Sequence, residues 1–142
     1  NRNHLDLALQ KILESGKRKI GFIGLSFKTG TDDLRESPLV TLAEQLIGKG
    51  MQLSIYDPEV HLAKLLGANR SFIERHLPHI GEMLRAEIDD VINESEVLVI
   101  GLSGPEIAAR LASTCKREQI LLDLVNLPNR ALIQSVVHGL CW

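Results

Sequence analysis

Apolar residues along this chain are spaced first as in a helix and then as in a strand, and the two patterns keep alternating. Residues 5–13 carry leucine and isoleucine at helical spacing, and Gly16 is a suitable helix stop. The run 19–25 has the composition of a buried parallel strand, residues 39–47 carry a second helical stripe, and residues 51–58 alternate as a strand does. A strand, a helix and a strand in this order predict a βαβ unit.

The second half of the chain continues to alternate. Its predicted elements are, in order, short helices or ordered loops at 61–67 and 71–80, a helix at 89–95, a strand at 96–101, a helix at 104–113, a strand at 119–125, and a helix with a final short strand within 131–142. This alternation predicts an α/β fold with a doubly wound, mostly parallel, Rossmann-like sheet flanked by helices. The helical pattern before Gly16 is predicted to be the end of a long helix that enters the domain.

Composition narrows the possible functions. The chain has 142 residues, 44% of them apolar, and a formal charge of -2, which argues against disorder and against a nucleic-acid-binding surface. No apolar run reaches the roughly 18–20 residues of a membrane span, so we expect no membrane partner. Cys115 and Cys141 lack CxxC spacing and a nearby cluster of histidines, so we expect no metal site, no disulfide framework, and a reducing, cytoplasmic setting.

Three polar stretches, 24–38, 101–106 and 123–129, follow predicted strands, where open parallel sheets bind their ligands. The first, GLSFKTGTDDLRESP, carries the most chemistry. Lys28 is a flexible point cation and Arg35 a planar fork, and both suit the oxygen atoms of a phosphate. The sequence therefore predicts an anion site in this loop.

The same region allows two other interpretations. Lys28 and Arg35 could instead pair with acids of their own loop, such as Asp32 and Asp33, which also suit turn capping. A dinucleotide fingerprint fits poorly, because the glycines give GxxGxS instead of GxGxxG, and Asp57 lies farther along than the roughly 20 residues expected for a ribose-binding acid. Neither cysteine and none of the five histidines shows the spacing of a nucleophile or of a catalytic triad.

The run IGFIGLSFKTGTDDLRESP (20–38), with YDP at 56–58, resembles the C-terminal domain of the UDP-glucose/GDP-mannose dehydrogenase family. The resemblance implies that residues 1–17 are the tail of a central dimerisation helix and residues 18–142 a sugar-nucleotide-binding domain. For the whole enzyme it implies oxidation of a sugar-nucleotide C6 alcohol to a carboxylate, with two NAD molecules reduced and a thioester on a cysteine. Because that cysteine and the NAD-binding domain lie elsewhere in the family, we expect no catalytic residue here and no turnover by this chain alone.

The resemblance also assigns roles within the loop. Phe27 and Lys28 match positions that contact the sugar nucleotide, and Arg35 matches an arginine that reaches NAD bound by the other domain. Asp32 and Asp33 are then expected to brace the two cations.

Features near the end of the chain indicate the substrate. The segment DLVNLP (123–128) and the ending HGLCW resemble bacterial members that oxidise GDP-mannose, which implies a place in alginate biosynthesis and a homodimer or higher homo-oligomer. UDP-sugar members often carry an arginine where this chain has 123–126, and Arg130 is a weak candidate to replace it. Three alternatives stay open: a UDP-glucose 6-dehydrogenase domain, a nucleotide-binding module without catalysis, and a purely structural domain.

Overall fold

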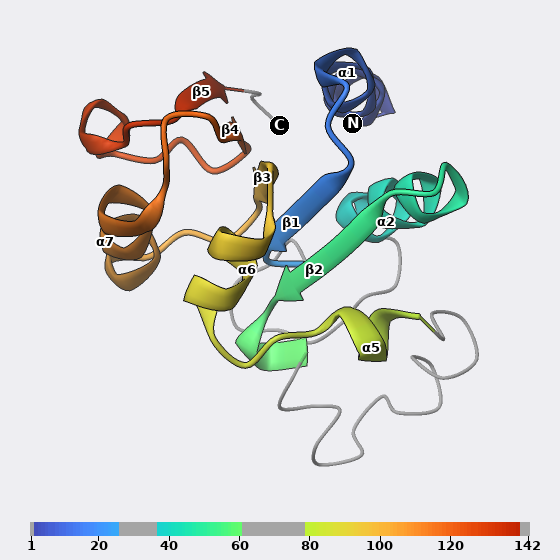
Figure 1. The fold of residues 1–142 in the computed structure, drawn as a ribbon, viewed down its shortest axis with the longest axis horizontal. Coiled ribbons are helices and arrows are strands. Elements are labelled where there is room, and N and C mark those ends of the chain that lie inside the picture. Colours follow the sequence, from blue (N-terminus) through green and yellow to red (C-terminus); the bar gives the residue numbers. More distant parts are fainter. Residues whose placement is uncertain (1, 26–36, 61–78, 140–142) are drawn as a thin grey trace.

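A computed structural model describes residues 2–25, 37–60 and 79–139 and confirms the predicted α/β class. Five strands form one sheet in which every neighbouring pair is parallel, in the order β2-β1-β3-β4-β5 (Figure 1). The strands are β1 (Lys19–Ile23), β2 (Gln52–Tyr56), β3 (Val97–Ile100), β4 (Ile120–Asp123) and β5 (Val136–Gly139). All the predicted strands are present, each somewhat shorter than its apolar run.

Helices cover both faces of the sheet, as the doubly wound prediction requires (Figure 1). They are α1 (Arg2–Ser15), α2 (Pro38–Gly48), α5 (Ile80–Met83), α6 (Ile88–Glu94) and α7 (Pro105–Thr114). One buried cluster joins α1 and α2 to Ile20 and Phe22 of β1, and a second joins α6 and α7 to Ile23. Successive β1 side chains therefore enter opposite layers, which is the two-residue period of a strand buried on both faces.

The end of the chain differs in part from the prediction. Over the described residues 130–139 the structure has one 3-10 turn, η1 (Arg130–Leu132), and β5 in place of a longer helix. Leu132 is 70% exposed, so this turn has no apolar face to bury, and β5 begins only four residues later. The predicted segment 61–67 lies outside the described residues, and α5 overlaps only the end of 71–80.

Local sequence signals set the two ends of helix α2. Pro38 occupies its first turn, where a missing backbone N–H has no cost, and Ser37 is its N-cap. The helix ends in a Schellman motif: Gly50 has φ +81°, its N–H donates to Ile47 O at 3.0 Å, and the Met51 N–H donates to Leu46 O at 3.1 Å. The helix thus runs from the carboxyl edge of the sheet to its amino edge.

Candidate functional site

The strand order reverses between β1 and β3, and this reversal marks the place where an open parallel sheet binds its ligand. The register aligns the last residues of four strands in one row, in which Tyr56, Ile23, Ile100 and Asp123 are neighbours. The loop 24–38 leaves β1 at this row, and 101–104 leaves β3 beside it. We refer to this carboxyl edge of the sheet as the mouth.

The five residues predicted to act in the loop, Phe27, Lys28, Asp32, Asp33 and Arg35, lie outside the described residues. Their roles therefore stay predictions. What the structure does describe is the two ends of the loop, which are Leu25 on one side and Ser37 on the other.

Both ends are bound to the mouth by buried hydrogen bonds. The Leu25 N–H donates to Asp57 Oδ2 at 2.8 Å, and the Ser37 hydroxyl donates to Leu25 O at 2.6 Å. One residue earlier, the Gly24 N–H donates to Tyr56 O at 2.7 Å. The loop therefore departs from and returns to a common point beside the end of β2.

Asp57 is fully buried at the end of β2 and serves as a backbone acceptor. Its Oδ1 accepts the N–H groups of Glu59 at 3.1 Å and Val60 at 3.2 Å, which is N-cap geometry for the helical turn that starts at Pro58. Its other oxygen holds Leu25. From the sequence, Asp57 is a candidate ribose ligand at an unsuitable spacing, but an aspartate before a proline is also a turn and cap signal.

The glycines of the first strand are explained by packing. A Cβ at Gly21 would lie 2.8 Å from Leu98 Cδ2 and would also collide with Ser95 Oγ. Gly24 has φ +96°, and a Cβ there would collide with Leu102. Because these glycines are required for packing and Asp57 accepts backbone N–H groups, these three described residues do not form a dinucleotide fingerprint.

The turn after β4 is organised by a second buried carboxylate. Asp123 accepts the N–H groups of Val125 at 3.0 Å and Leu127 at 2.8 Å, and Arg130 Nε donates to its Oδ2 at 2.8 Å. Asn126, between them, has φ 58°. Arg130, the candidate substitute for the arginine of UDP-sugar members, is therefore held by Asp123, with its side chain 40% exposed.

A cavity of about 390 Å³ lies next to the mouth, between the starts of α6 and α7 and beside Tyr56. It is lined by Tyr56, Glu87, Ile88, Asp89, Glu106, Ile107, Ala109 and Arg110. Burial, followed by the charges of Glu106, Glu87 and Asp57, raises the pKa of Tyr56. Three carboxylates outnumber the single arginine here, and that arginine already pairs with Asp89, so the cavity does not suit a diphosphate.

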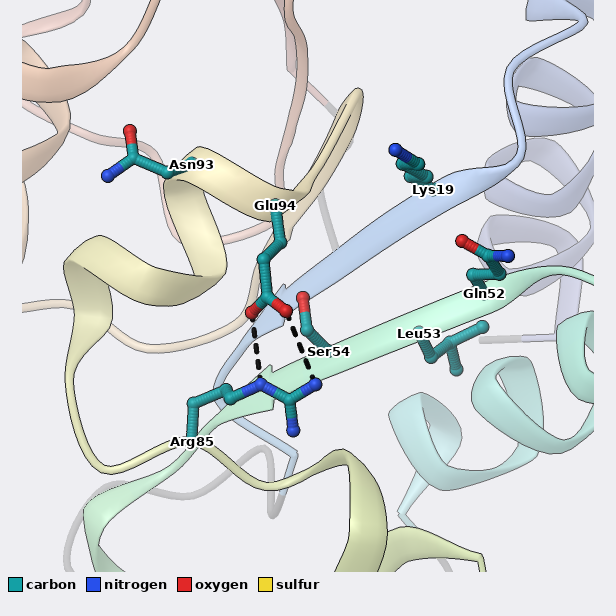
Figure 2. Close-up of a pocket in the computed structure, with 7 residues that line it drawn as sticks. All are labelled: Lys19, Gln52, Leu53, Ser54, Arg85, Asn93 and Glu94. Atoms are coloured by element: carbon teal, nitrogen blue, oxygen red, sulfur yellow. Dashed lines mark hydrogen bonds and ion pairs between the residues drawn. The ribbon is translucent and has the colours of Figure 1, made fainter.

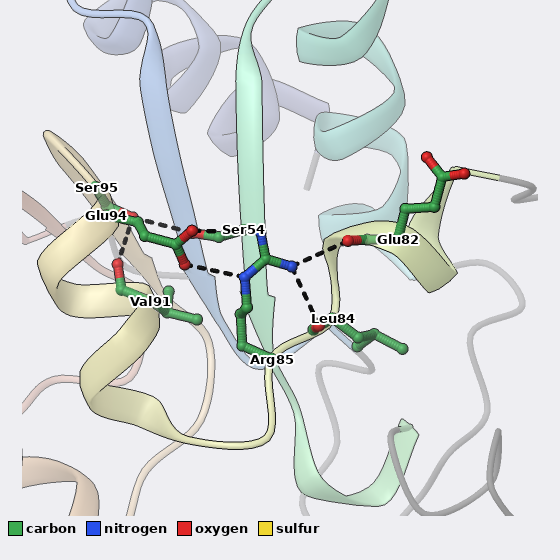
Figure 3. Close-up of polar contacts among 7 residues, drawn as sticks. All are labelled: Ser54, Glu82, Leu84, Arg85, Val91, Glu94 and Ser95. Carbon is green, nitrogen blue, oxygen red and sulfur yellow. Dashed lines mark hydrogen bonds and ion pairs between the residues drawn. The ribbon is translucent and has the colours of Figure 1, made fainter.

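Another cavity, of about 250 Å³, lies over β1 and β2 and includes Lys19 and Gln52, their first residues (Figure 2). Arg85 and Glu94 face each other across it with two bonds of 3.0 and 3.3 Å. The remaining Arg85 nitrogen donates to Glu82 O and Leu84 O, so this guanidinium ties the end of α5 to the end of α6 (Figure 3). Because all three guanidinium nitrogens of Arg85 donate to groups of the protein, this residue has a structural role. Sequence reasoning did not find it.

The described cysteine has the surroundings of a structural residue. Cys115 is buried, and burial raises its thiol pKa to about 11, although a hydrogen bond with the Ser135 side chain acts in the opposite direction. A thiol this weakly ionised is a poor nucleophile at neutral pH. Within the described ranges no three His, Cys, Asp or Glu residues gather as metal ligands, and no helix there is long and apolar enough to span a membrane.

An all-parallel sheet whose order reverses beside a long polar loop is typical of nucleotide-binding α/β domains. Residues 21–130 match the model of the UDP-glucose/GDP-mannose dehydrogenase family, UDP binding domain, and the chain belongs to this family. This confirms the resemblance carried by the loop motif.

Relatives of known name support this assignment along the whole chain. GDP-mannose 6-dehydrogenase of Pseudomonas aeruginosa is 44% identical over 143 residues, covering 100% of this chain and 32% of that protein, and that of Azotobacter vinelandii is 41% identical with the same coverage. A 1.55 Å crystal structure of a ternary complex of GDP-mannose dehydrogenase from P. aeruginosa superposes with a TM-score of 0.85 at 43% identity, over 100% of this chain and 32% of that one. The chain thus spans about a third of the length of these relatives.

Proposed function

We propose that this chain is the sugar-nucleotide-binding domain of an NAD-dependent GDP-mannose 6-dehydrogenase. The observation that carries the proposal is the level of identity, which is 41–44% to six GDP-mannose 6-dehydrogenases over the whole chain. The putative UDP-glucose 6-dehydrogenase of Bacillus subtilis is 29% identical over 95% of the chain. The difference favours GDP-mannose over UDP-glucose as the substrate.

The intact protein would oxidise the C6 alcohol of GDP-mannose to the carboxylate of GDP-mannuronate, a step suited to alginate biosynthesis. Each sugar would lose four electrons as two hydrides to two NAD molecules, and water would supply the second carboxylate oxygen. The cysteine that carries the thioester lies outside this chain in the proposal. Cys115 supports this view, because its buried thiol with a raised pKa is unsuited to attack.

Within the domain, we assign Phe27 and Lys28 to the sugar nucleotide, Arg35 to NAD bound by another domain, and Asp32 and Asp33 to bracing. Support comes from the position of their loop, whose two described ends meet at the mouth next to the reversal of strand order. Helix α1 is proposed to continue a dimerisation helix. Its Leu7 and Leu13 are 45% and 42% exposed, which leaves apolar surface for a partner helix.

The substrate is tested by NADH formation with the intact protein that carries this chain, supplied with GDP-mannose or UDP-glucose. We expect turnover with GDP-mannose and two NADH per sugar oxidised. Equal rates with the two sugars, or activity with UDP-glucose alone, would overturn the preference for GDP-mannose. No NADH with either sugar, from a protein that still binds GDP-mannose, would favour the module without catalysis.

The site is tested by removing each cation in turn. Lys28→Ala should weaken GDP-mannose binding roughly 10- to 100-fold, the value of a hydrogen bond to a charged group. Arg35→Ala should mainly raise the KM for NAD. Matched controls are Lys49→Ala and Arg117→Ala, which remove exposed cations at the opposite edge of the sheet. Unchanged constants in both loop variants would refute the assignment.

A further inference from the structure

We infer that Ser37 and Asp57 are positioning residues for nucleotide binding: together they fix the residue from which the predicted ligand loop departs. The inference rests on the proposed function, because it assumes that the loop between Leu25 and Ser37 meets the sugar nucleotide. It concerns residues that do not themselves contact a ligand. Their effect is carried through the backbone of Leu25.

Leu25 is held by both of its backbone polar groups through side chains that are distant in sequence. Asp57, 32 positions away, accepts its N–H at 2.8 Å, and Ser37, 12 positions away, donates to its carbonyl at 2.6 Å. All three residues are buried, and the Leu25 side chain is fully enclosed in the layer under α2. Neither backbone group is therefore exchangeable with water without opening this part of the core.

The Ser37 hydroxyl makes a different hydrogen bond from the one that a serine at a helix N-cap usually makes. A serine at a helix N-cap ordinarily accepts a backbone N–H of the first turn, and this contributes about 1 kcal/mol to stability. Ser37 is the N-cap of α2, yet it makes no side-chain cap bond. Its hydroxyl is used instead to join the end of the loop to its beginning.

The Asp57 carboxylate is equally specific to its position, because both of its oxygens are occupied. Oδ1 accepts two amides of the following turn and Oδ2 accepts Leu25. Asparagine has the same shape but one acceptor oxygen, so in either orientation its NH2 group would face an N–H donor. Two acceptor oxygens at position 57 are thus needed for the two backbone segments to meet at the mouth.

These anchors join the two ends of the segment that the proposed function assigns to the ligand. Eleven residues, 26–36, separate Leu25 from Ser37, and a loop whose ends are already joined has fewer conformations to lose when it binds. Removing one anchor should therefore weaken binding even though no contact with the ligand is lost. A typical net hydrogen-bond contribution corresponds to roughly a 2- to 10-fold change in Kd.

The test compares two serines with the same chemistry at opposite edges of the sheet. Ser135 is also buried, and its hydroxyl also donates to a backbone carbonyl, that of Lys116, at 2.5 Å, but it lies before β5 at the amino edge. In the intact protein, Ser37→Ala and Ser135→Ala should lower the thermal unfolding temperature by similar amounts. Calorimetric titration with GDP-mannose should show a Kd raised roughly 2- to 10-fold in Ser37→Ala alone. Equal Kd values in both variants would overturn the inference.

A second measurement needs no ligand and separates this inference from the proposed function. Trypsin cleaves after lysine and arginine, and Lys28 and Arg35 place two such bonds inside the loop. Ser37→Ala and Asp57→Asn should accelerate cleavage at these two bonds under native conditions, and Ser135→Ala should not. If the wild type fails to bind GDP-mannose, both the proposed function and the role of Ser37 and Asp57 in binding are refuted. Faster cleavage of Ser37→Ala and Asp57→Asn would still establish that these two residues hold the loop. Unchanged cleavage in both loop-anchor variants would refute the anchoring itself.

Discussion

Replacing Gly21 by alanine tests whether the glycines of the first strand serve packing or phosphate binding. The added Cβ would lie 2.8 Å from Leu98 Cδ2 and from Val91 Cγ1, and closer still to Ser95 Oγ. Ser95 has no room to withdraw, because its hydroxyl donates to Val91 O at 2.6 Å and lies 3.3 Å from Ser54 Oγ (Figure 3). Helix α6 must therefore move away from β1, or Ser95 must break its bond.

The expected loss of stability follows from these two alternatives. Inserting a methyl group into a packed interface costs about 1–3 kcal/mol, and a buried hydroxyl that loses its partner costs about 1–3 kcal/mol. Part of this loss of stability is offset, because glycine within a strand is less favourable than alanine by roughly 0.5–1 kcal/mol. We therefore expect Gly21→Ala to lower the free energy of unfolding by about 2 kcal/mol.

Urea unfolding followed by far-ultraviolet circular dichroism measures this change. Gly48→Ala is the matched control, because Gly48 is the last residue of α2 and no atom lies within 4 Å of its added Cβ. That control should be neutral or stabilising by about 0.4–1 kcal/mol. Folded Gly21→Ala protein should keep its affinity for GDP-mannose. A loss below about 0.5 kcal/mol would refute the packing argument, since surface substitutions commonly reach that size.

Three further predictions concern ionisable groups. Tyr56 is the sole tyrosine of the chain, and burial followed by the charge of Glu106 raises its pKa, so the phenolate absorbance of this domain should titrate above the ordinary value of 10.0. Glu106→Gln should lower the midpoint, and an unchanged midpoint would contradict the contribution of Glu106. Cys115, with its pKa raised from 9.0 to about 11, should alkylate roughly a hundredfold more slowly in the native than in the unfolded chain, as measured by peptide mass spectrometry. Backbone N–H groups of Arg18 and Lys19 lower the pKa of Glu96, so the stability that its carboxylate contributes should be full above about pH 4.5 and should be lost as the pH falls. Unfolding of the wild type and of Glu96→Gln across this range checks the sign. A difference in unfolding free energy that grew in acid would contradict it.

The sequence predicted the architecture well because its signals were local. Apolar spacing located the strands, and the Ser-Pro pair located the first residue of α2 at Pro38. The final short strand predicted within 131–142 is present as β5, but the helix predicted before it is replaced by a 3-10 turn, because no surface covers Leu132. Spacing reports which residues share a face, but it does not report whether another element buries that face.

The site was less predictable because its described parts join segments far apart in sequence. The bond from Leu25 to Asp57 spans 32 positions, and no local pattern announces it. Gly21 matches part of a dinucleotide fingerprint in the sequence, whereas in the fold its neighbour is Ser95, the residue that follows α6. The roles predicted for Lys28 and Arg35 came from the resemblance to a family and remain to be measured.

The two buried carboxylates at the mouth bear on what this domain contributes to a reaction. Asp57 and Asp123 are 0% and 1% exposed, and both use their oxygens to accept backbone N–H groups. Oxygens that already accept backbone N–H groups have few lone pairs left for a ligand. Each acid holds a backbone segment in position at the mouth. This supports the proposal that the domain binds and orients the sugar nucleotide while the chemistry is carried out by residues elsewhere in the protein.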